Sequence, residues 1–159
     1  MAKPRILFLG THNSVRSQMA EGLLRSAADD RYESLSAGLR PVAVDALALE
    51  VMREIGIDIS SQQSKDVQDF LNLPFSAVVT ICDEARKSCT RFPSGCRYLH
   101  WRFQDPVTIT GSRRERLAMF RLLRDEIALR IEQEFGTTSL ADSPEARADF
   151  ESAAAYNPI

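Results

Sequence analysis

The sequence predicts an α/β protein built on a four-stranded parallel sheet, with helices on both faces in three layers. Two apolar runs, residues 6–9 and 76–82, are typical of buried strands. Segments with helical spacing of apolar residues alternate with the strands, which favours parallel strands joined by helices. Ligands in such folds bind beyond the carboxyl ends of the strands. Gly10 and Cys82 stand at two such ends and are therefore candidate site residues.

The remaining elements follow in order along the chain. Strands are expected at 5–9, 32–37, 76–82 and 97–101. Helices are expected at 17–28, at 42 or 43 to 55, at 64–71 and at 112–135, whereas 83–89 could be helix or loop. Ser14 or Ser17 is expected to cap the first helix, and Ser112 and Gly136 to bound the last. Residues 1–136 are thus one domain, and residues 137–159, rich in Ala, Ser and Asp, a weakly ordered tail.

Composition narrows the class of protein. The chain has 159 residues, 44% of them hydrophobic, and a net charge of -2, which argues against a nucleic-acid binder. No apolar run approaches the roughly 18 residues of a membrane span, and the N-terminus is too quickly polar for a signal peptide. We therefore expect a cytoplasmic protein without a membrane partner. Structural disulfides are unusual in that reducing compartment, which leaves redox chemistry, metal binding or burial for the three cysteines.

The loop after the first strand is the strongest candidate site. A strand that runs through a short loop into a helix N-terminus gathers backbone N–H groups and partial positive charge. Arg16 adds a guanidinium that fits an oxyanion bidentately, Asn13 can hold the loop, and Ser17 can aim its hydroxyl into it. We predict that this loop binds a tetrahedral oxyanion through its residues Thr11, His12, Asn13, Ser14, Val15, Arg16 and Ser17.

Cys82 and Cys89 form the second candidate site. Residues seven apart on a helix share a face but lie about 10 Å apart along its axis, whereas a disulfide needs Cα atoms within about 7 Å. A disulfide between them would require this segment to bend or unwind, which predicts a mobile stretch from residue 82 to about 90. The alternative is a buried Cys82 at a strand end and an inert Cys89. A metal is not expected, because only His12 and His100 could complete its ligands. No cofactor is expected, and Cys96 is assigned no role.

Asp105 precedes Pro106 in a predicted loop. An Asp in this position is commonly a turn former. Its functional alternative is a general acid that protonates a leaving group at the anion site. His100 and Trp101 are expected to form a core pair at a strand end.

Several motifs resemble one family, in the same order and with similar spacing. They are THNSVRSQMAEG at 11–22, SAG at 36–38, GIDIS at 56–60, VVTICDEARKSC at 78–89, and LHW followed by DP at 99–106. Together they resemble the thioredoxin-coupled arsenate reductases, which have the fold of the low-molecular-weight tyrosine phosphatases. The likeness extends over roughly residues 4–135.

The resemblance implies roles for individual residues. The family's loop reads Cys, five residues, Arg, Ser, so Arg16 and Ser17 match its anion-binding arginine and thiolate-stabilising serine. Asp105 matches its general acid, and Cys82 and Cys89 match its two redox cysteines. The loop cysteine attacks arsenate, Cys82 would release arsenite and form a disulfide, and Cys89 would present that disulfide to thioredoxin or a similar dithiol. The implied ligands are arsenate, phosphate or sulfate.

The nucleophile position departs from the family pattern, because Gly10 stands where the family has cysteine. A glycine has no side chain and forms no covalent adduct. The chain is then either an inactive form of a reductase that binds an oxyanion without turnover, or a natural non-catalytic module for an oxyanion or phosphorylated ligand. A tyrosine-phosphatase-like enzyme is the further alternative, and it would not use Cys82 and Cys89. Without a loop cysteine, both are expected to be reduced thiols.

Overall fold

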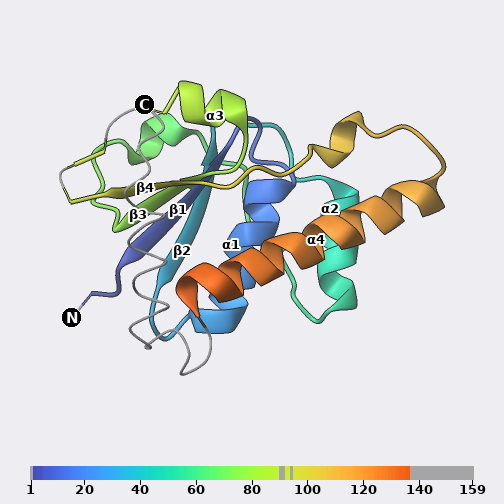
Figure 1. Ribbon diagram of the computed structural model, residues 1–159, viewed down its shortest axis with the longest axis horizontal. Helices are drawn as coiled ribbons and strands as arrows, with labels where there is room; N and C mark the ends of the chain where they lie inside the picture. The colour runs from blue at the N-terminus through green and yellow to red at the C-terminus, as the bar shows by residue number, and fades with distance from the viewer. Residues whose placement is uncertain (1, 90–91, 94, 137–159) are drawn as a thin grey trace.

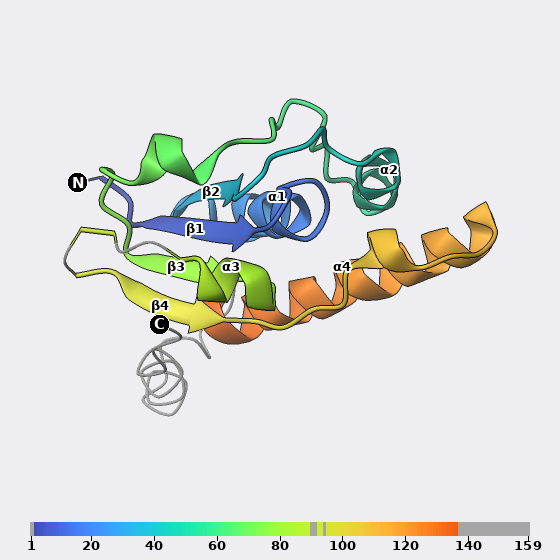
Figure 2. The same cartoon turned by 90° about the horizontal axis from the view of Figure 1, so that it is seen from above.

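The four predicted strands form one parallel sheet. The structure is a computed structural model that describes residues 2–89, 92–93 and 95–136. The strands are β1 (Arg5–Gly10), β2 (Glu33–Gly38), β3 (Ala77–Thr80) and β4 (Arg97–His100), in the order β2-β1-β3-β4. All neighbouring strands pair in parallel, so their carboxyl ends meet at one edge (Figure 2). The predicted fold class is confirmed.

Helices lie on both faces of the sheet. They are α1 (Arg16–Ala28), α2 (Ala46–Glu54), α3 (Asp83–Lys87) and α4 (Arg113–Phe135), with 3₁₀ turns η1 (Val67–Phe70) and η2 (Pro106–Thr108). On one face, α1 and α4 pack side by side and α2 packs against them (Figure 1). The other face is covered by the short elements η1 and α3. Alternation along β1 builds both cores: Ile6 and Phe8 enter the larger cluster, Leu7 and Leu9 the smaller.

The predicted cap of the first helix and the predicted start of the second are wrong. The prediction that a serine caps α1 fails, because its N-cap is Val15 and makes no side-chain capping bond. The second helix begins at Ala46 rather than at 42 or 43, after the Asp45 cap. Residues 40–45 are instead extended along the loop that follows β1, where the N–H groups of Arg40, Val42 and Asp45 donate to its carbonyls. A segment whose N–H groups are already bonded to another loop does not continue a helix backwards.

The last helix ends as predicted. Ser112 caps α4 by accepting a hydrogen bond from the Glu115 N–H at 3.1 Å, and Gly136 follows it with a φ of 54°. The predicted tail, residues 137–159, lies outside the described residues. Within the described part of the chain, no helix is both long and apolar enough to cross a membrane. The sheet edge at the carboxyl ends is therefore the place to look for a site.

Candidate active site

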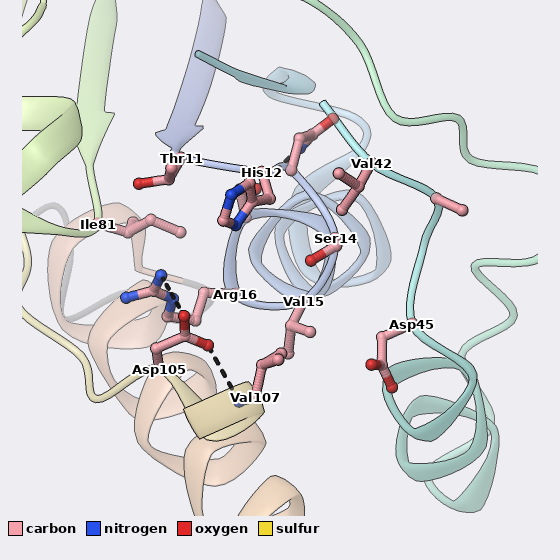
Figure 3. A pocket seen from close by; sticks show the side chains of 14 residues that line it. Thr11, His12, Ser14, Val15, Arg16, Val42, Asp45, Ile81, Asp105 and Val107 are labelled. Atoms are coloured by element: carbon pink, nitrogen blue, oxygen red, sulfur yellow. Dashed lines mark hydrogen bonds and ion pairs between the residues drawn. The ribbon is translucent and has the colours of Figure 1, made fainter. Parts of the chain in front are cut away.

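A pocket of about 270 Å³ opens where β1 ends and α1 begins (Figure 3). All eight residues from Gly10 to Ser17 line it. The rest of its wall is made by Val42, Ala43, Asp45, Ile81, Asp105 and Val107. The structure thus brings the whole predicted anion loop, the nucleophile position and the predicted general acid into one cavity.

The backbone of this loop is arranged for an anion. The carbonyls of Thr11, His12 and Ser14 accept hydrogen bonds from N–H groups of the extended segment 40–45, at 2.8–3.0 Å. The first turn of α1 has no side-chain cap, so its N–H groups retain their bonding capacity. N–H groups at a helix start, with the positive end of the helix dipole, are a general anion-binding arrangement. The missing cap therefore leaves these N–H groups able to bind an anion.

Asn13 fixes the shape of the loop. It is buried and adopts a φ of 50°, a left-handed conformation that asparagine tolerates better than most residues. Its Nδ2 donates to Ser17 Oγ at 2.8 Å, and its Oδ1 accepts from Gln18 Nε2 and from the Lys65 N–H, both at 2.9 Å. These bonds tie the loop to α1 and to residues 63–65, as the predicted loop-holding role requires.

A buried carboxylate beneath the loop was not predicted from the sequence. The Glu21 side chain is only 3% exposed and accepts from Ser36 Oγ at 2.9 Å. Its oxygens also meet the Lys65 ammonium at 3.2 Å and the Arg25 guanidinium at 2.6 Å. In the sequence, Glu21 and Arg25 have the spacing of a surface pair on one helix face, and nothing in the pattern links them to Lys65. These contacts link the buried Glu21 carboxylate to Lys65, whose backbone N–H donates to Asn13.

Arg16 and Asp105 lie next to each other in the wall of the pocket (Figure 3). Arg16 Nη2 lies 3.6 Å from Asp105 Oδ2, and Nη1 donates to the Phe103 carbonyl at 3.1 Å. Asp105 Oδ1 accepts from the Val107 N–H at 3.0 Å and so caps η2. Asp105 therefore forms a turn with one oxygen and turns the other toward the pocket (Figure 3). The two sequence interpretations of this residue are compatible.

Gly10 has no conformational reason to be glycine. It ends β1, and its φ lies outside the positive range that favours glycine. A Cβ at this position would lie 3.4 Å from Ser17 Oγ and 3.5 Å from the Ile81 side chain, which are ordinary contacts. At Gly38, by contrast, a Cβ would lie 2.9 Å from the Asn13 nitrogen and the Thr11 carbonyl oxygen. Glycine is required at 38, whereas position 10 has room for a side chain beside Ser17.

Of the two redox candidates, Cys82 contacts Thr11, the residue that follows Gly10. Cys82 Sγ is 3.1 Å from Thr11 Oγ1, and it accepts from the Ala85 N–H at 3.4 Å as the N-cap of α3. Cys89 follows the other end of α3, where burial raises the pKa of its thiol to about 11. All cysteines of the chain are thiols. The open choice for residues 83–89 is resolved as a helix over Asp83–Lys87, and Cys89 lies beyond its C-cap. A Cys82–Cys89 disulfide would bridge this helix, which we expect to require α3 to unwind.

The predicted core pair at the end of β4 is half wrong. Trp101 is buried against Phe8 and Phe135, as expected. His100 instead enters a polar chain, with Nδ1 2.8 Å from Thr80 Oγ1 and Nε2 3.2 Å from Asp83 Oδ1. Successive residues of a strand point to opposite faces, so the two side chains separate. Among the described residues no cluster of His, Cys, Asp and Glu could hold a metal.

The parallel sheet, with a pocket that holds an arginine and a carboxylate at the carboxyl ends of its strands, is typical of an α/β protein of the phosphatase type. Comparison with known proteins makes this specific: residues 5–142 match the model of the low molecular weight phosphotyrosine protein phosphatase family. The chain belongs to that family.

Individual relatives point to one branch. The chain is 43% identical, over 131 residues, to an arsenate reductase of Halalkalibacterium halodurans, covering 82% of this chain and 94% of the relative. A solved arsenate reductase in the phosphate-binding state superposes with a TM-score of 0.66 at 28% identity, covering 81% and 94% of the two chains. The thioredoxin-dependent arsenate reductase Cg_ArsC1' of Corynebacterium glutamicum gives 0.60 at 27% identity, covering 83% and 63%.

Proposed function

We propose that this chain is an arsenate reductase of the thioredoxin-coupled type in a form that lacks its loop nucleophile. As written, it binds an oxyanion and does not turn it over. The observation that carries this proposal is the 3.1 Å contact between Cys82 Sγ and Thr11 Oγ1, directly beside Gly10. A phosphatase has no use for a second thiol at that place, whereas a reductase needs one to attack the adduct.

The loop supplies the binding. Arsenate, phosphate and sulfate are tetrahedral anions of similar charge, and each can accept hydrogen bonds from the N–H groups of residues 11–17. The Arg16 guanidinium offers a planar fork for two oxygens. Asp105, 3.6 Å from that guanidinium, is placed to give a proton to a departing oxygen.

The chemistry would follow from a thiol at position 10. A cysteine thiolate there would attack arsenic and displace a hydroxide that Asp105 protonates. Cys82 would then attack the loop sulfur, the S–As bond electrons would stay on arsenic, and arsenite would leave. Two thiols are oxidised to a disulfide while arsenic(V) is reduced to arsenic(III). Cys89 would take over that disulfide and a thioredoxin-type dithiol would reduce it. A dithiol-dependent cycle of this kind operates in a reducing compartment, which favours the cytoplasm.

The decisive experiment restores the nucleophile. Gly10→Cys should consume NADPH in the presence of arsenate, thioredoxin and thioredoxin reductase, whereas the unaltered chain should bind phosphate but consume none. Gly10→Ser is the matched control, because it fills the same space with a poor nucleophile. Gly10→Cys combined with Cys82→Ser should again be inactive in the coupled assay.

Two results would overturn the proposal. One is a folded Gly10→Cys variant that binds phosphate but reduces no arsenate. The other is hydrolysis of aryl phosphates that survives replacement of Cys82 and Cys89 by serine while arsenate reduction is absent, which would identify a phosphatase. Absence of any binding of phosphate, sulfate or arsenate to the unaltered chain would contradict the oxyanion site itself.

A further inference from the structure

Cys96 is a thiol that the cycle above does not use. It directly precedes β4, after Gly95, and is half-buried. Its Sγ donates to the Arg97 carbonyl at 3.5 Å. Cys82 and Cys89 each have a task in the proposed function, so the surroundings of Cys96 decide whether it is a bystander.

Cys96 shares its surroundings with Cys89. Both pack in the smaller apolar cluster on the α3 face, together with Phe92 and Tyr98. The Tyr98 hydroxyl accepts a hydrogen bond from the Phe92 N–H at 2.9 Å, which draws the chain on either side of Cys96 together. Burial and, to a smaller extent, the nearby Cys89 thiol raise the pKa of the Cys96 thiol to about 11, against the opposing effect of a hydrogen bond with Tyr98.

Cys82 is held away from this group. It caps the N-terminus of α3 beside Thr11, whereas Cys89 follows the C-terminus of the same helix. The five-residue helix α3 separates the two cysteines; a spacing of seven residues along an ideal helix corresponds to about 10 Å, beyond the roughly 7 Å between Cα atoms that a disulfide spans. A Cys82–Cys89 disulfide therefore holds α3 in an unwound state, and such strained disulfides are the ones that exchange readily.

We propose that Cys96 is the last thiol of the relay and accepts the disulfide from Cys89. The Cys96 thiolate attacks Cys89 Sγ, a new Cys89–Cys96 bond forms, the Cys82–Cys89 bond breaks, and Cys82 leaves as a thiolate that takes up a proton. The exchange involves no net oxidation. Cys82 and α3 then return to their positions beside the loop. The Cys89–Cys96 disulfide remains, and an external dithiol reduces it by attack on the more exposed Cys96. This inference rests on the proposed function for the origin of the first disulfide.

The pairing can be tested on the chain as it exists, without arsenate. Glutathione disulfide oxidises two protein thiols to a disulfide and is itself reduced to two glutathione thiols. After alkylation of the remaining thiols, trypsin places the three cysteines on three different peptides, because it cuts after Arg86, Lys87, Arg91 and Arg97. Mass spectrometry should find residues 88–91 linked to residues 92–97, with Cys82 alkylated. Cys96→Ser should abolish that linked pair and leave Cys82–Cys89 or glutathione adducts.

A predominant Cys82–Cys89 or Cys82–Cys96 link in the intact chain, or glutathione adducts alone, would overturn the proposal. A kinetic test follows in the Gly10→Cys variant. There, Cys96→Ser should leave the single-turnover release of arsenite unchanged and lower kcat/KM for thioredoxin; an unchanged kcat/KM would also overturn it. If Gly10→Cys proves inactive, the proposed function fails, whereas the peptide map still decides the pairing.

Discussion

The two regions that meet at Gly10, the anion loop (residues 10–17) and the redox segment (residues 82–89), are secured in opposite ways. The loop is held from beneath by buried hydrogen bonds of Asn13 and by the buried Glu21 cluster. The redox segment also has buried apolar side chains, but its five-residue helix carries exposed ion pairs where the loop has buried hydrogen bonds: Asp83 pairs with Arg102, and Glu84 with Arg40. Breaking a buried hydrogen bond costs more free energy than losing an exposed ion pair, which contributes little to stability.

This contrast fits what each region has to do. An anion site must keep its donors in place before the ligand arrives, since donors that are already oriented do not have to be ordered on binding. A segment that joins Cys82 to Cys89 must unwind, and local opening is easier in a short helix whose polar contacts are exposed ion pairs. We therefore expect a rigid binding loop beside a helix that opens locally, at a lower free energy than the unfolding of the domain.

The largest stability loss is expected from Asn13→Ala. It removes three hydrogen bonds, leaves buried partners unsatisfied and places alanine at a φ of 50°. We expect a loss of about 3 kcal/mol in the free energy of unfolding, measured by urea titration, and weaker phosphate binding. Asn13→Gly is the matched control: glycine accepts the backbone conformation and should recover about 1 kcal/mol. Equal losses of stability in both variants would show that the φ of 50° at this position does not penalise alanine.

Lys65→Met tests the cluster beneath the loop. The Lys65 ammonium is 23% exposed and meets a carboxylate that is 3% exposed, so its removal leaves Glu21 with the Arg25 pair alone. We expect a loss of about 2 kcal/mol in the free energy of unfolding. Lys3→Met removes an exposed lysine paired with Asp29 and should cause no measurable loss. A loss as small at Lys65 as at Lys3 would show that the loop is not braced from beneath.

Local patterns in the sequence were sufficient for the fold and the anion loop. Apolar runs located β1 and β3, and the Gly-to-Arg spacing located the loop residues of the pocket, because both signals depend on residues close together in the chain. The Glu21–Lys65 pair joins residues 44 apart, which no local periodicity encodes. The extended segment 40–45 was missed for a similar reason: its conformation is set by bonds to the loop at 11–14 rather than by its own residues.

The redox segment should respond to pH through His100. Burial is the main cause that lowers the pKa of this imidazole, Arg86 lowers it further, and Asp83 opposes the shift. The folded state therefore binds fewer protons than the unfolded chain, whose histidine titrates near about 6.5. The contribution of His100 to stability is complete above that pH and is lost as the pH falls below it. Between about pH 8 and pH 5.5, the urea midpoint should decline more steeply for the unaltered chain than for His100→Gln. If the urea midpoints of the two proteins decline in parallel, His100 does not cause the pH dependence.

Arg102→Gln should have the smallest effect on global stability. The Arg102 side chain is 78% exposed, so loss of its pair with Asp83 should leave the urea midpoint unchanged. The change should appear locally. Asp83 is the first residue of α3, and of its two partners, Arg102 and His100, only His100 would remain. Hydrogen exchange should become faster at the Arg86 and Ser88 amides, which are bonded within this helix, and remain unchanged in β1.

Arg5→Gln is the matched control for this change, since it removes an exposed pair with Glu33 at the far end of the sheet. It should leave exchange in α3 unchanged. If Arg102→Gln accelerates exchange equally in α3 and β1, the helix opens only when the whole domain unfolds. The redox segment would then be as firmly held as the loop, and a disulfide between Cys82 and Cys89 would require global rather than local opening.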